Sequence, residues 1–319
     1  MTDINSIEKG HTMRVLVTGA TGWIGSALVP ELLGAGHQVV GLARSDASAA
    51  ALAEAGAEVR RGSLDDLDVL GEAAADSDGV VHLAFKHDVA FAQGDFLAAT
   101  AADRRAVETI GAALAGSDRP FAIASGTTGV AAPGRVATEA DGLGTFPLVP
   151  EGPRARQATA LYTLSLAGTG VRSSVVRLAP TTHGDGDHGF LATLIAVARE
   201  KGFAGYVGDG ANRWPAGHRL DAARLFRLAL EKAPAGSVLH ANADEGVPLR
   251  EIAEVIGRHL GVPARSVSPE DAPAHFGWLA AFVGSDVPAS SAATRKLLGW
   301  EPTQPGLLED LDKGHYFGA

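Results

Sequence analysis

The stretch VLVTGATGWIGSALVPELL, residues 15–33, joins a short β-branched run, a glycine-rich turn and the start of an apolar helix. Gly19 permits the tight turn, Gly22 lets the backbone approach a pyrophosphate, and Gly25 lets the helix pack closely on the strand. The helix N-terminus adds amide donors and the positive end of its dipole. The stretch predicts a dinucleotide-binding turn, with a ligand-free tight turn as the alternative. The cofactor-binding residues expected here are Gly19, Thr21, Gly22, Trp23, Ile24 and Gly25.

Short β-branched runs alternate with Ala- and Leu-rich helical stretches through the first half of the chain. Repeated βα units on this spacing predict an α/β fold with a doubly wound parallel sheet, the Rossmann architecture. Ligands then bind at the carboxyl ends of the strands, near the point where the strand order reverses. The expected strands are Arg14–Thr18, Gln38–Ala43, Glu58–Arg61, Gly79–Ala84, Phe121–Ser125 and Arg172–Leu178. The expected helices are 23–35, 47–55, 65–76, 95–116 and 154–169.

After residue 178 this alternation breaks, which indicates a second, smaller lobe. The elements expected there are a polar loop at 181–189, helices at 190–201, 220–233 and 248–260, a glycine-rich turn at 204–212, a strand at 237–241 and a Pro-rich connector at 262–274. We therefore expect three parts. They are a loosely held N-terminal tail at 1–12, an NADP-binding Rossmann domain at 13–180 and about 218–245, and a discontinuous substrate-binding lobe at about 181–217 and 246–319.

Composition narrows the function classes. The chain has 319 residues, of which 46% are hydrophobic and 20% charged, as in a soluble globular protein with a sizeable core. No apolar run reaches 18 residues, so no membrane span is expected, and a net charge of −10 argues against nucleic acid as the main partner. The absence of cysteine excludes disulfides, thiolate catalysis and Cys-ligated zinc, and it fits a cytoplasmic protein.

The end of the second expected strand indicates which dinucleotide is bound. An NAD-specific protein usually carries an acidic residue about twenty positions beyond the glycines, which holds the ribose 2′-hydroxyl. Here that position falls at Ala43, followed by Arg44 and Ser45. A guanidinium and a hydroxyl suit a 2′-phosphate, so the sequence favours NADP(H) over NAD(H). In the alternative interpretation, Ser45 or Asp46 only caps the next helix, and the two roles are compatible.

Three segments, TGATGWIGSAL (18–28), VVHLAF (80–85) and TRKLLGWEP (294–302), resemble the extended and atypical short-chain dehydrogenase/reductase superfamily. That group includes sugar-nucleotide epimerases, 3β-hydroxysteroid dehydrogenases and dihydroflavonol-type reductases, and the resemblance covers roughly residues 13–302. It implies contacts to the adenine after the third strand, and contacts closer to the nicotinamide after the fourth and sixth strands. The residues at these positions are Ser63, Leu64, Ala84, Pro180 and Thr181.

By the same resemblance, catalysis needs a Ser or Thr after the fifth strand and a Tyr-x-x-x-Lys pair on the following helix. The Tyr exchanges the hydroxyl proton, and the Lys lowers its pKa and holds the ribose. Ser125 and Thr127 are available for the first role. No tyrosine in the chain is followed by lysine four residues later, and the usual Lys position falls near Arg156.

Because the Tyr-x-x-x-Lys pair is missing, other polar groups would have to bind the ribose and supply the proton. Arg156 or Arg154 could hold the ribose or polarise a carbonyl, but neither can act as a general acid because guanidinium keeps its proton. The loop TTHGDGDHGF (181–190) is expected to cross the nicotinamide, where His183 or His188 could donate a proton near neutral pH. In the alternative interpretation, the loop is turn scaffolding and Arg156 is a solvated helix start. We expect no metal site, because no helical H-E-x-x-H spacing occurs.

In related folds, the region around Trp214 and His218 lines the substrate pocket, and Phe190 with the aromatics of 275–282 could form an apolar lid. The alternative interpretation assigns these aromatics to the core. The leading hypothesis is an NADPH-dependent reductase of a small, largely apolar ketone or aldehyde, with a non-standard proton donor. An NADP(H)-binding sensor without turnover, an imine reductase, and a sugar-nucleotide epimerase or dehydratase remain as alternatives. Relatives often dimerise through the helices expected at 95–116 and 154–169, which leaves a homodimer open.

Overall fold

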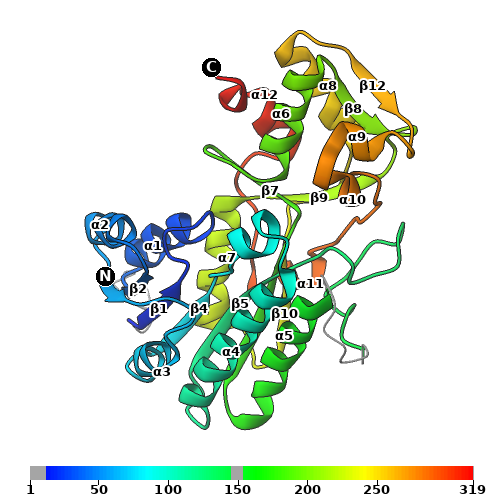
Figure 1. The fold of residues 1–319 in the computed structure, drawn as a ribbon. Coiled ribbons are helices and arrows are strands. Elements are labelled where there is room, and N and C mark those ends of the chain that lie inside the picture. The colour runs from blue at the N-terminus through cyan, green and yellow to red at the C-terminus, as the bar shows by residue number, and fades with distance from the viewer. Residues whose placement is uncertain (1–11, 145–153, 319) are drawn as a thin grey trace, which may run out of the picture. The chain divides into compact units, whose positions relative to one another are not determined.

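The structure of the chain is a computed structural model that describes residues 12–144 and 154–318. Its main sheet has seven strands in the order β10-β6-β5-β4-β1-β2-β3, flanked by helices, and this confirms the predicted doubly wound α/β fold (Figure 1). The strands of this sheet are β1 (Arg14–Thr18), β2 (Gln38–Ala43), β3 (Glu58–Arg61), β4 (Gly79–His82), β5 (Pro120–Gly126), β6 (Arg172–Leu178) and β10 (Ser237–Ala241).

The strand order reverses beside β1. This strand pairs in parallel with β2 on one side, where Val15 lies opposite Val39, and with β4 on the other, where Val15 lies opposite Gly79. The chain runs outward from β1 to β3 and then returns to β4 next to β1. In an open α/β sheet, such a reversal opens a crevice at the carboxyl ends of the two strands. Thr18 ends β1 and His82 ends β4, so the segments that follow them begin at this crevice.

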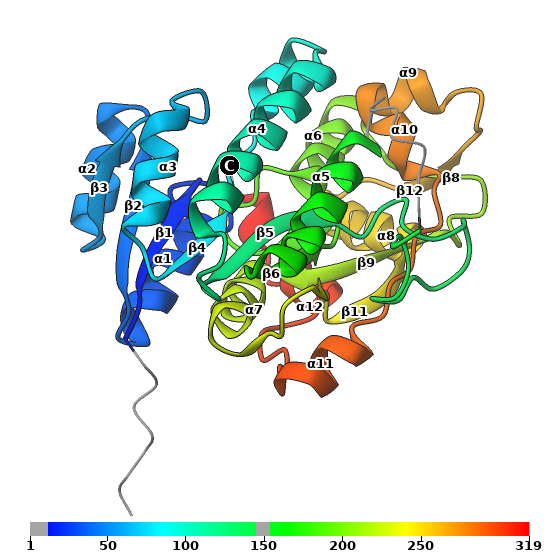
Figure 2. The same ribbon diagram turned by 90° about the horizontal axis from the view of Figure 1, so that it is seen from below.

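One compact unit of the chain comprises Met1–Ala124, Phe146–Val175 and Ala223–Ser237. On one face of its strands α3, α4 and α5 pack side by side, and α1 and α7 lie on the other face, where an ion pair joins Arg227 to Glu31 at 2.7 Å (Figure 2). Its helices are α1 (Gly25–Gly34), α2 (Asp46–Glu54), α3 (Leu67–Ala75), α4 (Phe96–Leu114), α5 (Arg154–Ser165) and most of α7 (Arg219–Lys232).

A second compact unit comprises Ser125–Thr145, Val176–Ala222 and Val238–Ala319. It contains a three-stranded sheet in the order β11-β9-β7 and a parallel pair of β12 with β8. Its additional strands are β7 (Thr181–His183), β8 (Ala204–Val207), β9 (Arg213–His218), β11 (Asp244–Pro248) and β12 (Ala264–Val267). Its helices are α6 (Phe190–Lys201), α8 (Leu249–Leu260), α9 (Ala272–Phe276), α10 (Ala280–Val283), α11 (Ala292–Leu298) and α12 (Leu307–Asp312).

The residue pattern explains these elements. A parallel strand covered on both faces reads as a continuous apolar run, and Val15, Leu16 and Val17 of β1 are all fully buried. A helix covered on one face is amphipathic instead, as in α8, where Ile252 and Ile256 are buried while Glu254 and other charged residues of the helix are exposed. Within residues 12–144 and 154–318, no helix combines the length and the apolar character that crossing a membrane requires.

The structure differs from the sequence predictions mainly in the second unit. The stretches expected as a polar loop, a glycine-rich turn and a Pro-rich connector contain the strands β7, β8 and β12 and the helix α9. These strands have three or four residues each, which is too short for an alternating pattern to stand out. The compact units divide inside β5 and β6, and the assignment of a cofactor domain and a substrate lobe stays a prediction. Residues 1–11 of the expected tail lie outside the described residues.

We predict opposite effects of two Gly→Ala changes in α1. A Cβ on Gly25 would lie 2.1 Å from the Gly19 carbonyl oxygen, whereas nothing lies within 4 Å of a Cβ on Gly34. Overpacking costs about 1–3 kcal/mol, so Gly25→Ala should lower the free energy of unfolding by about this amount. Gly34→Ala should raise it by up to about 1 kcal/mol, because alanine favours helix. Urea unfolding followed by circular dichroism measures both, and equal midpoints for the two variants would contradict the close packing of α1 on the turn.

Candidate functional site

The turn between β1 and α1 is shaped by a close approach of two backbone segments. Gly19 has a φ of +66°, and a Cβ at this position would lie 2.7 Å from the backbone nitrogen of Ala84. The Gly22 N–H donates to the Gly19 carbonyl at 2.9 Å and closes the turn, and α1 begins at Gly25. The first amides of a helix lack acceptors within the helix, and they form the donor set to which a pyrophosphate binds. The residues of this turn therefore fit a dinucleotide.

The carboxyl end of β2 presents positive charge. The Arg44 side chain is 71% exposed and lies 3.7 Å from Asp88. Ser45 caps α2 through reciprocal hydrogen bonds with Ser48, so its capping role is realised. Arg61 adds a second guanidinium at this end of the sheet, donates to the Ser45 carbonyl oxygen at 2.6 Å and forms an ion pair with Asp46 at 2.8 Å. The sequence analysis missed Arg61 because only the pairing of β3 with β2, which sets Ala43 opposite Arg61, reveals its position.

Two other predicted cofactor residues follow β3. The backbone N–H and the hydroxyl of Ser63 both donate to Asp66 at 2.8 Å, and these hydrogen bonds lower the pKa of the Asp66 carboxyl. Leu64 is buried and packs with Leu42 and Leu70. Both residues therefore build the loop that leaves β3, and a contact of either residue with adenine stays a prediction.

Arg156 lies in the first turn of α5. Its Nη2 donates to the Ala124 carbonyl at 3.2 Å, and its guanidinium carbon lies 4.3 Å from the centre of the Phe85 ring. Burial lowers the pKa of the guanidinium, and the negative charge of Asp103 opposes that shift. No carboxylate in residues 12–144 or 154–318 forms an ion pair with Arg156. A guanidinium has five N–H donors, so several remain for a ligand.

Ser125 and Thr127 lie at and just beyond the end of β5, and both are buried. The Thr127 N–H donates to the Leu178 carbonyl at 3.0 Å, and its hydroxyl faces the same oxygen at 3.5 Å. The Ser125 hydroxyl has no hydrogen-bond partner among the residues that the structure describes. Ser125 also follows Ala124, whose carbonyl binds Arg156. Of the two hydroxyls, that of Ser125 is the one still available to a ligand.

In the second unit, His183 belongs to a buried polar cluster. It is paired in register with His218 across β7 and β9, and the two rings are 5.3 Å apart, edge to face. Its Nδ1 lies 2.8 Å from Asp310, and its buried Nε2 has no partner among the described residues. Burial raises the pKa of Asp310, but hydrogen bonding and charge from His183 outweigh this effect and lower it. The predicted alternative donor, His188, is exposed.

The loop after β7 is tied to the C-terminal segment. The Tyr316 hydroxyl accepts from the Gly184 N–H at 3.0 Å and donates to Asp187 at 3.1 Å. Burial raises the pKa of both Tyr316 and Asp187. Two other predicted cofactor residues, Pro180 and Thr181, lie before this loop, where Thr181 begins β7. The Thr181 hydroxyl donates to the Pro215 carbonyl at 2.6 Å. No sequence signal connects Tyr316 with a loop more than 120 residues earlier.

The three side chains of this cluster are also residue types that can bind a metal cation. His183, His218 and Asp310 offer three ligand atoms within 4.8 Å of one another. An ionised Asp310 only accepts, so the His183 Nδ1 carries a proton toward it. The Leu220 N–H donates to the His218 Nδ1 at 3.2 Å, and burial lowers the pKa of His218, so the neutral ring holds its proton on Nε2. Hydrogen bonds thus account for the Nδ1 atoms of both histidines, whereas the His183 Nε2 has no partner among the described residues, and the expected absence of a metal stays a prediction.

Two of the predicted substrate residues, Phe190 and Trp214, lie in an aromatic cluster of the second unit. Phe190 lies 5.6 Å from Trp214, 5.5 Å from Trp278 and 5.2 Å from Phe282, measured between ring centres. Trp214 is 1% exposed and packs in the core, whereas Trp278 is 53% exposed. Sequence analysis grouped these rings by composition, and their mutual contacts depend on β9 meeting α6 and α10. A substrate contact of Phe190, Trp214 or His218 stays a prediction.

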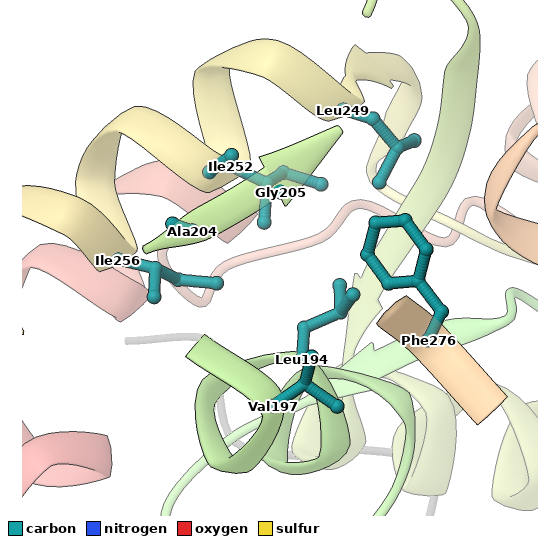
Figure 3. Close-up of a pocket in the computed structure, with 9 residues that line it drawn as sticks. Leu194, Val197, Ala204, Gly205, Leu249, Ile252, Ile256 and Phe276 are labelled. Carbon is teal, nitrogen blue, oxygen red and sulfur yellow. The ribbon is translucent and has the colours of Figure 1, made fainter. Parts of the chain in front are cut away.

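A cavity in the core of the second unit is too small for a substrate. Its volume is about 10 Å³, and its lining is apolar, with side chains from α6, α8 and α9 around β8 (Figure 3). Such a volume holds about one water-sized sphere, and an apolar cavity of this kind stays dry. The residues around it therefore serve packing.

Comparison with known proteins identifies the family. The sequence matches the NAD dependent epimerase/dehydratase family over residues 15–241. An uncharacterized protein of Schizosaccharomyces pombe is 48% identical, over 96% of this chain and 100% of its own length. An uncharacterized protein of Saccharomyces cerevisiae is 44% identical, over 94% of this chain and 98% of its own length. The 4-hydroxy-2-methyl-3-oxo-4-farnesyl-3,4-dihydroquinoline-1-oxide ketoreductase of Stigmatella aurantiaca is 28% identical, over 91% of this chain and 88% of its own.

Solved structures agree with this fold. The dTDP-glucose 4,6-dehydratase DesIV of Streptomyces venezuelae, determined with NAD bound, superimposes with a TM-score of 0.74 at 21% identity, over 95% of this chain and 96% of its own. The UDP-glucose 4-epimerase of Thermotoga maritima superimposes with a TM-score of 0.73 at 20% identity, over 96% of this chain and 98% of its own. Together with the family match, these likenesses confirm the predicted resemblance to the short-chain dehydrogenase/reductase superfamily. With its Rossmann sheet, its glycine turn and its family match over residues 15–241, the chain belongs to the NAD-dependent epimerase/dehydratase family and is an NAD(P)-dependent oxidoreductase-type enzyme.

Proposed function

We propose that this enzyme reduces a small, largely apolar ketone or aldehyde with NADPH, and that Arg156 performs the electrophilic role of the absent Tyr-x-x-x-Lys pair. The observation that carries the proposal is the guanidinium of Arg156, which lies against Phe85 and pairs with no carboxylate in the described part of the chain. A fixed cation in a site of low polarity stabilises the negative oxygen that forms when a carbonyl is reduced.

The preference for NADPH rests on Arg44 and Arg61. Arg44 directly follows Ala43, the position where NAD-specific proteins usually carry an acid, and Arg61 ends the neighbouring strand β3 opposite Ala43. A 2′-phosphate has several acceptor oxygens, and guanidinium donors match them in pairs. Among the described residues, the exposed side chain of Arg44 is held only by a long ion pair to Asp88, so it is available to a phosphate.

The chemistry can be assigned to residues of this chain. When NADPH is bound, it supplies a hydride to the carbonyl carbon and is oxidised to NADP⁺. The Arg156 N–H groups orient the carbonyl oxygen and neutralise its growing charge, but they do not release their protons. The Ser125 hydroxyl, next to the peptide that Arg156 holds, is the group that we assign to proton delivery, with solvent water restoring its proton.

Several features support a carbonyl reductase over other reactions of this family. Epimerases and dehydratases begin by removing a hydroxyl proton, and the Tyr-x-x-x-Lys base is absent. The relative from Stigmatella aurantiaca is a ketoreductase. The aromatic cluster around Phe190 suits an apolar substrate. An NADP(H)-binding sensor is the second candidate, because the cofactor turn is intact while the usual acid/base pair is missing. The homodimer and the cytoplasmic location stay predictions.

Arg44→Ala should weaken NADPH binding by about 10- to 100-fold, because a hydrogen bond to a charged group contributes about 1.5–3 kcal/mol. NADH binding should change by less than about twofold, since the lost group faces only the 2′-phosphate. Arg60→Ala is the control, because Arg60 lies on β3 directly before Arg61 and its guanidinium pairs with Glu72. Fluorescence titration of both cofactors measures the dissociation constants. An equal loss for NADPH and NADH would contradict the assignment of Arg44.

Arg156→Met should lower kcat by about 100-fold or more, as removal of an oxyanion donor does, with a smaller change in the dissociation constant for NADPH. Arg156→Lys should retain part of the activity. Arg104→Met is the matched control, because Arg104 also lies over an aromatic ring, that of Tyr162, at 3.8 Å. The assay follows 340 nm absorbance with NADPH and a panel of ketones, aldehydes and cyclic imines. NADPH binding without turnover of any panel member would favour the sensor, and equal rates for both Met variants would exclude the role of Arg156.

A further inference from the structure

The Arg156 guanidinium lies against a group of aromatic side chains in the first compact unit. Its central carbon lies 4.3 Å from the centre of the Phe85 ring. The Phe85 ring in turn lies 5.0 Å from the His87 ring, edge to face, and 5.9 Å from the Phe96 ring, measured between ring centres. All four residues belong to the same compact unit of the chain. Phe85 therefore contacts the cation on one side and other aromatic rings around it.

Both chain neighbours of Phe85 are restrained. Before it, Ala84 approaches the glycine turn so closely that a Cβ on Gly19 would lie 2.7 Å from the Ala84 nitrogen. After it, the Lys86 ammonium donates to both oxygens of the Asp65 carboxylate, at 2.8 and 2.6 Å. The Phe85 ring is thus held shortly after the end of β4, next to the segment that borders the glycine turn.

The Arg156 side chain reaches the ends of two neighbouring strands. Its Nη2 donates to the carbonyl of Ala124 in β5, and its guanidinium carbon lies over the ring of Phe85, which follows β4. The two strands pair in parallel. A cation over a ring is attracted by the negative charge of the ring face, and this attraction requires no N–H group to be given up to an acceptor. Phe85 therefore holds the guanidinium while the N–H groups that Ala124 does not use can donate elsewhere.

A carboxylate partner would hold a guanidinium differently. Asp286 accepts from Arg213 at 3.0 and 2.9 Å, and such a pair occupies two N–H groups and neutralises the charge. At Arg156, burial disfavours the charged form and lowers the pKa of the guanidinium. The face of the Phe85 ring favours a cation and so opposes this effect. An aromatic partner keeps both the charge and the donors of Arg156 available to a negative oxygen.

We infer that Phe85 is a positioning residue for the reduction, because its ring holds the Arg156 guanidinium in place with its charge and its donors available to the carbonyl oxygen. The inference rests on the proposed function, in which Arg156 stabilises that oxygen. Phe85 acts through Arg156. Its removal therefore lowers kcat and leaves the KM for NADPH nearly unchanged.

The test compares Phe85→Leu with Tyr162→Leu. Both changes remove a partly buried ring that lies against a guanidinium, since the Tyr162 ring centre lies 3.8 Å from the central carbon of Arg104. Phe85→Leu should lower kcat about tenfold and change the KM for NADPH by less than about twofold, whereas Tyr162→Leu should change both by less than about twofold. Phe85→Tyr keeps the ring and should restore most of the lost kcat. The assay follows 340 nm absorbance with the panel member that is reduced fastest.

A double-mutant cycle separates positioning from packing. In Arg156→Met no guanidinium is left to hold, so the addition of Phe85→Leu should lower kcat by less than about twofold. A loss of about tenfold in both backgrounds would show that Phe85 acts independently of Arg156, and it would overturn the inference. Should Phe85→Leu fail to fold, Phe85→Met takes its place, because an unbranched methionine adapts to irregular space.

Magnetic resonance gives a readout that needs neither substrate nor cofactor. With nitrogen-15 arginine in the full chain, the Nε–Hε signal of Arg156 is the one that Arg156→Met removes. The ring current shields a proton above a ring face, so this signal should move downfield in Phe85→Leu. In Tyr162→Leu it should keep its position, and the Arg104 signal should move instead.

The outcomes separate this inference from the proposed function. An Arg156 signal that stays in place in Phe85→Leu would overturn the positioning role, even if the protein reduces carbonyls as proposed. If the unchanged protein binds NADPH and reduces no member of the panel, the proposed function fails. The position of the Arg156 signal then still decides whether Phe85 holds the guanidinium.

Discussion

The approach of two backbones at the carboxyl ends of β1 and β4 governs the cofactor half of the molecule. Gly19 and Ala84 come so close that no side chain fits between them, and Gly25 brings α1 down onto the same turn. This packing requires parallel pairing of β1 with β4, which in turn requires the strand order to reverse beside β1. The glycine turn lies at the crevice that results, and a pyrophosphate binds to the backbone amides of such a turn without any charged side chain.

The parts of the fold that local pattern determines could be predicted from the sequence. The predicted bounds of β1, β2, β3 and β6 agree with those in the structure. The glycine turn could be predicted as well, because the backbone conformation and close packing of the turn require glycine at these positions. Short strands such as β7 and β9 could not be predicted, since three to six residues with Gly, Pro and His between them carry no periodic signal.

The parts of the site that depend on contacts between distant segments could not be predicted from the sequence, because local patterns do not show which segments pack together. Arg61 joins Arg44 only because β3 pairs with β2, and Asp310 meets His183 from a helix 127 residues further along the chain. The position of Arg156 near the usual lysine could be predicted from residue spacing along the helix. Its contact with Phe85 and its bond to Ala124 could not, because they require α5 to pack beside the ends of β4 and β5. Sequence reasoning found the groups, and the fold decides which of them meet.

Replacing a lysine and a tyrosine by one arginine changes how a carbonyl can be reduced. A guanidinium stabilises a negative oxygen but does not give up its proton, so charge stabilisation and proton delivery fall to different groups. The most direct measurement of this account uses NADPH deuterated at either face of C4, incubated with the protein and a carbonyl substrate. The account predicts deuterium on the carbinol carbon from one face only, detected by mass spectrometry of the alcohol. Cofactor that binds but transfers no deuterium from either face to any carbonyl would contradict it.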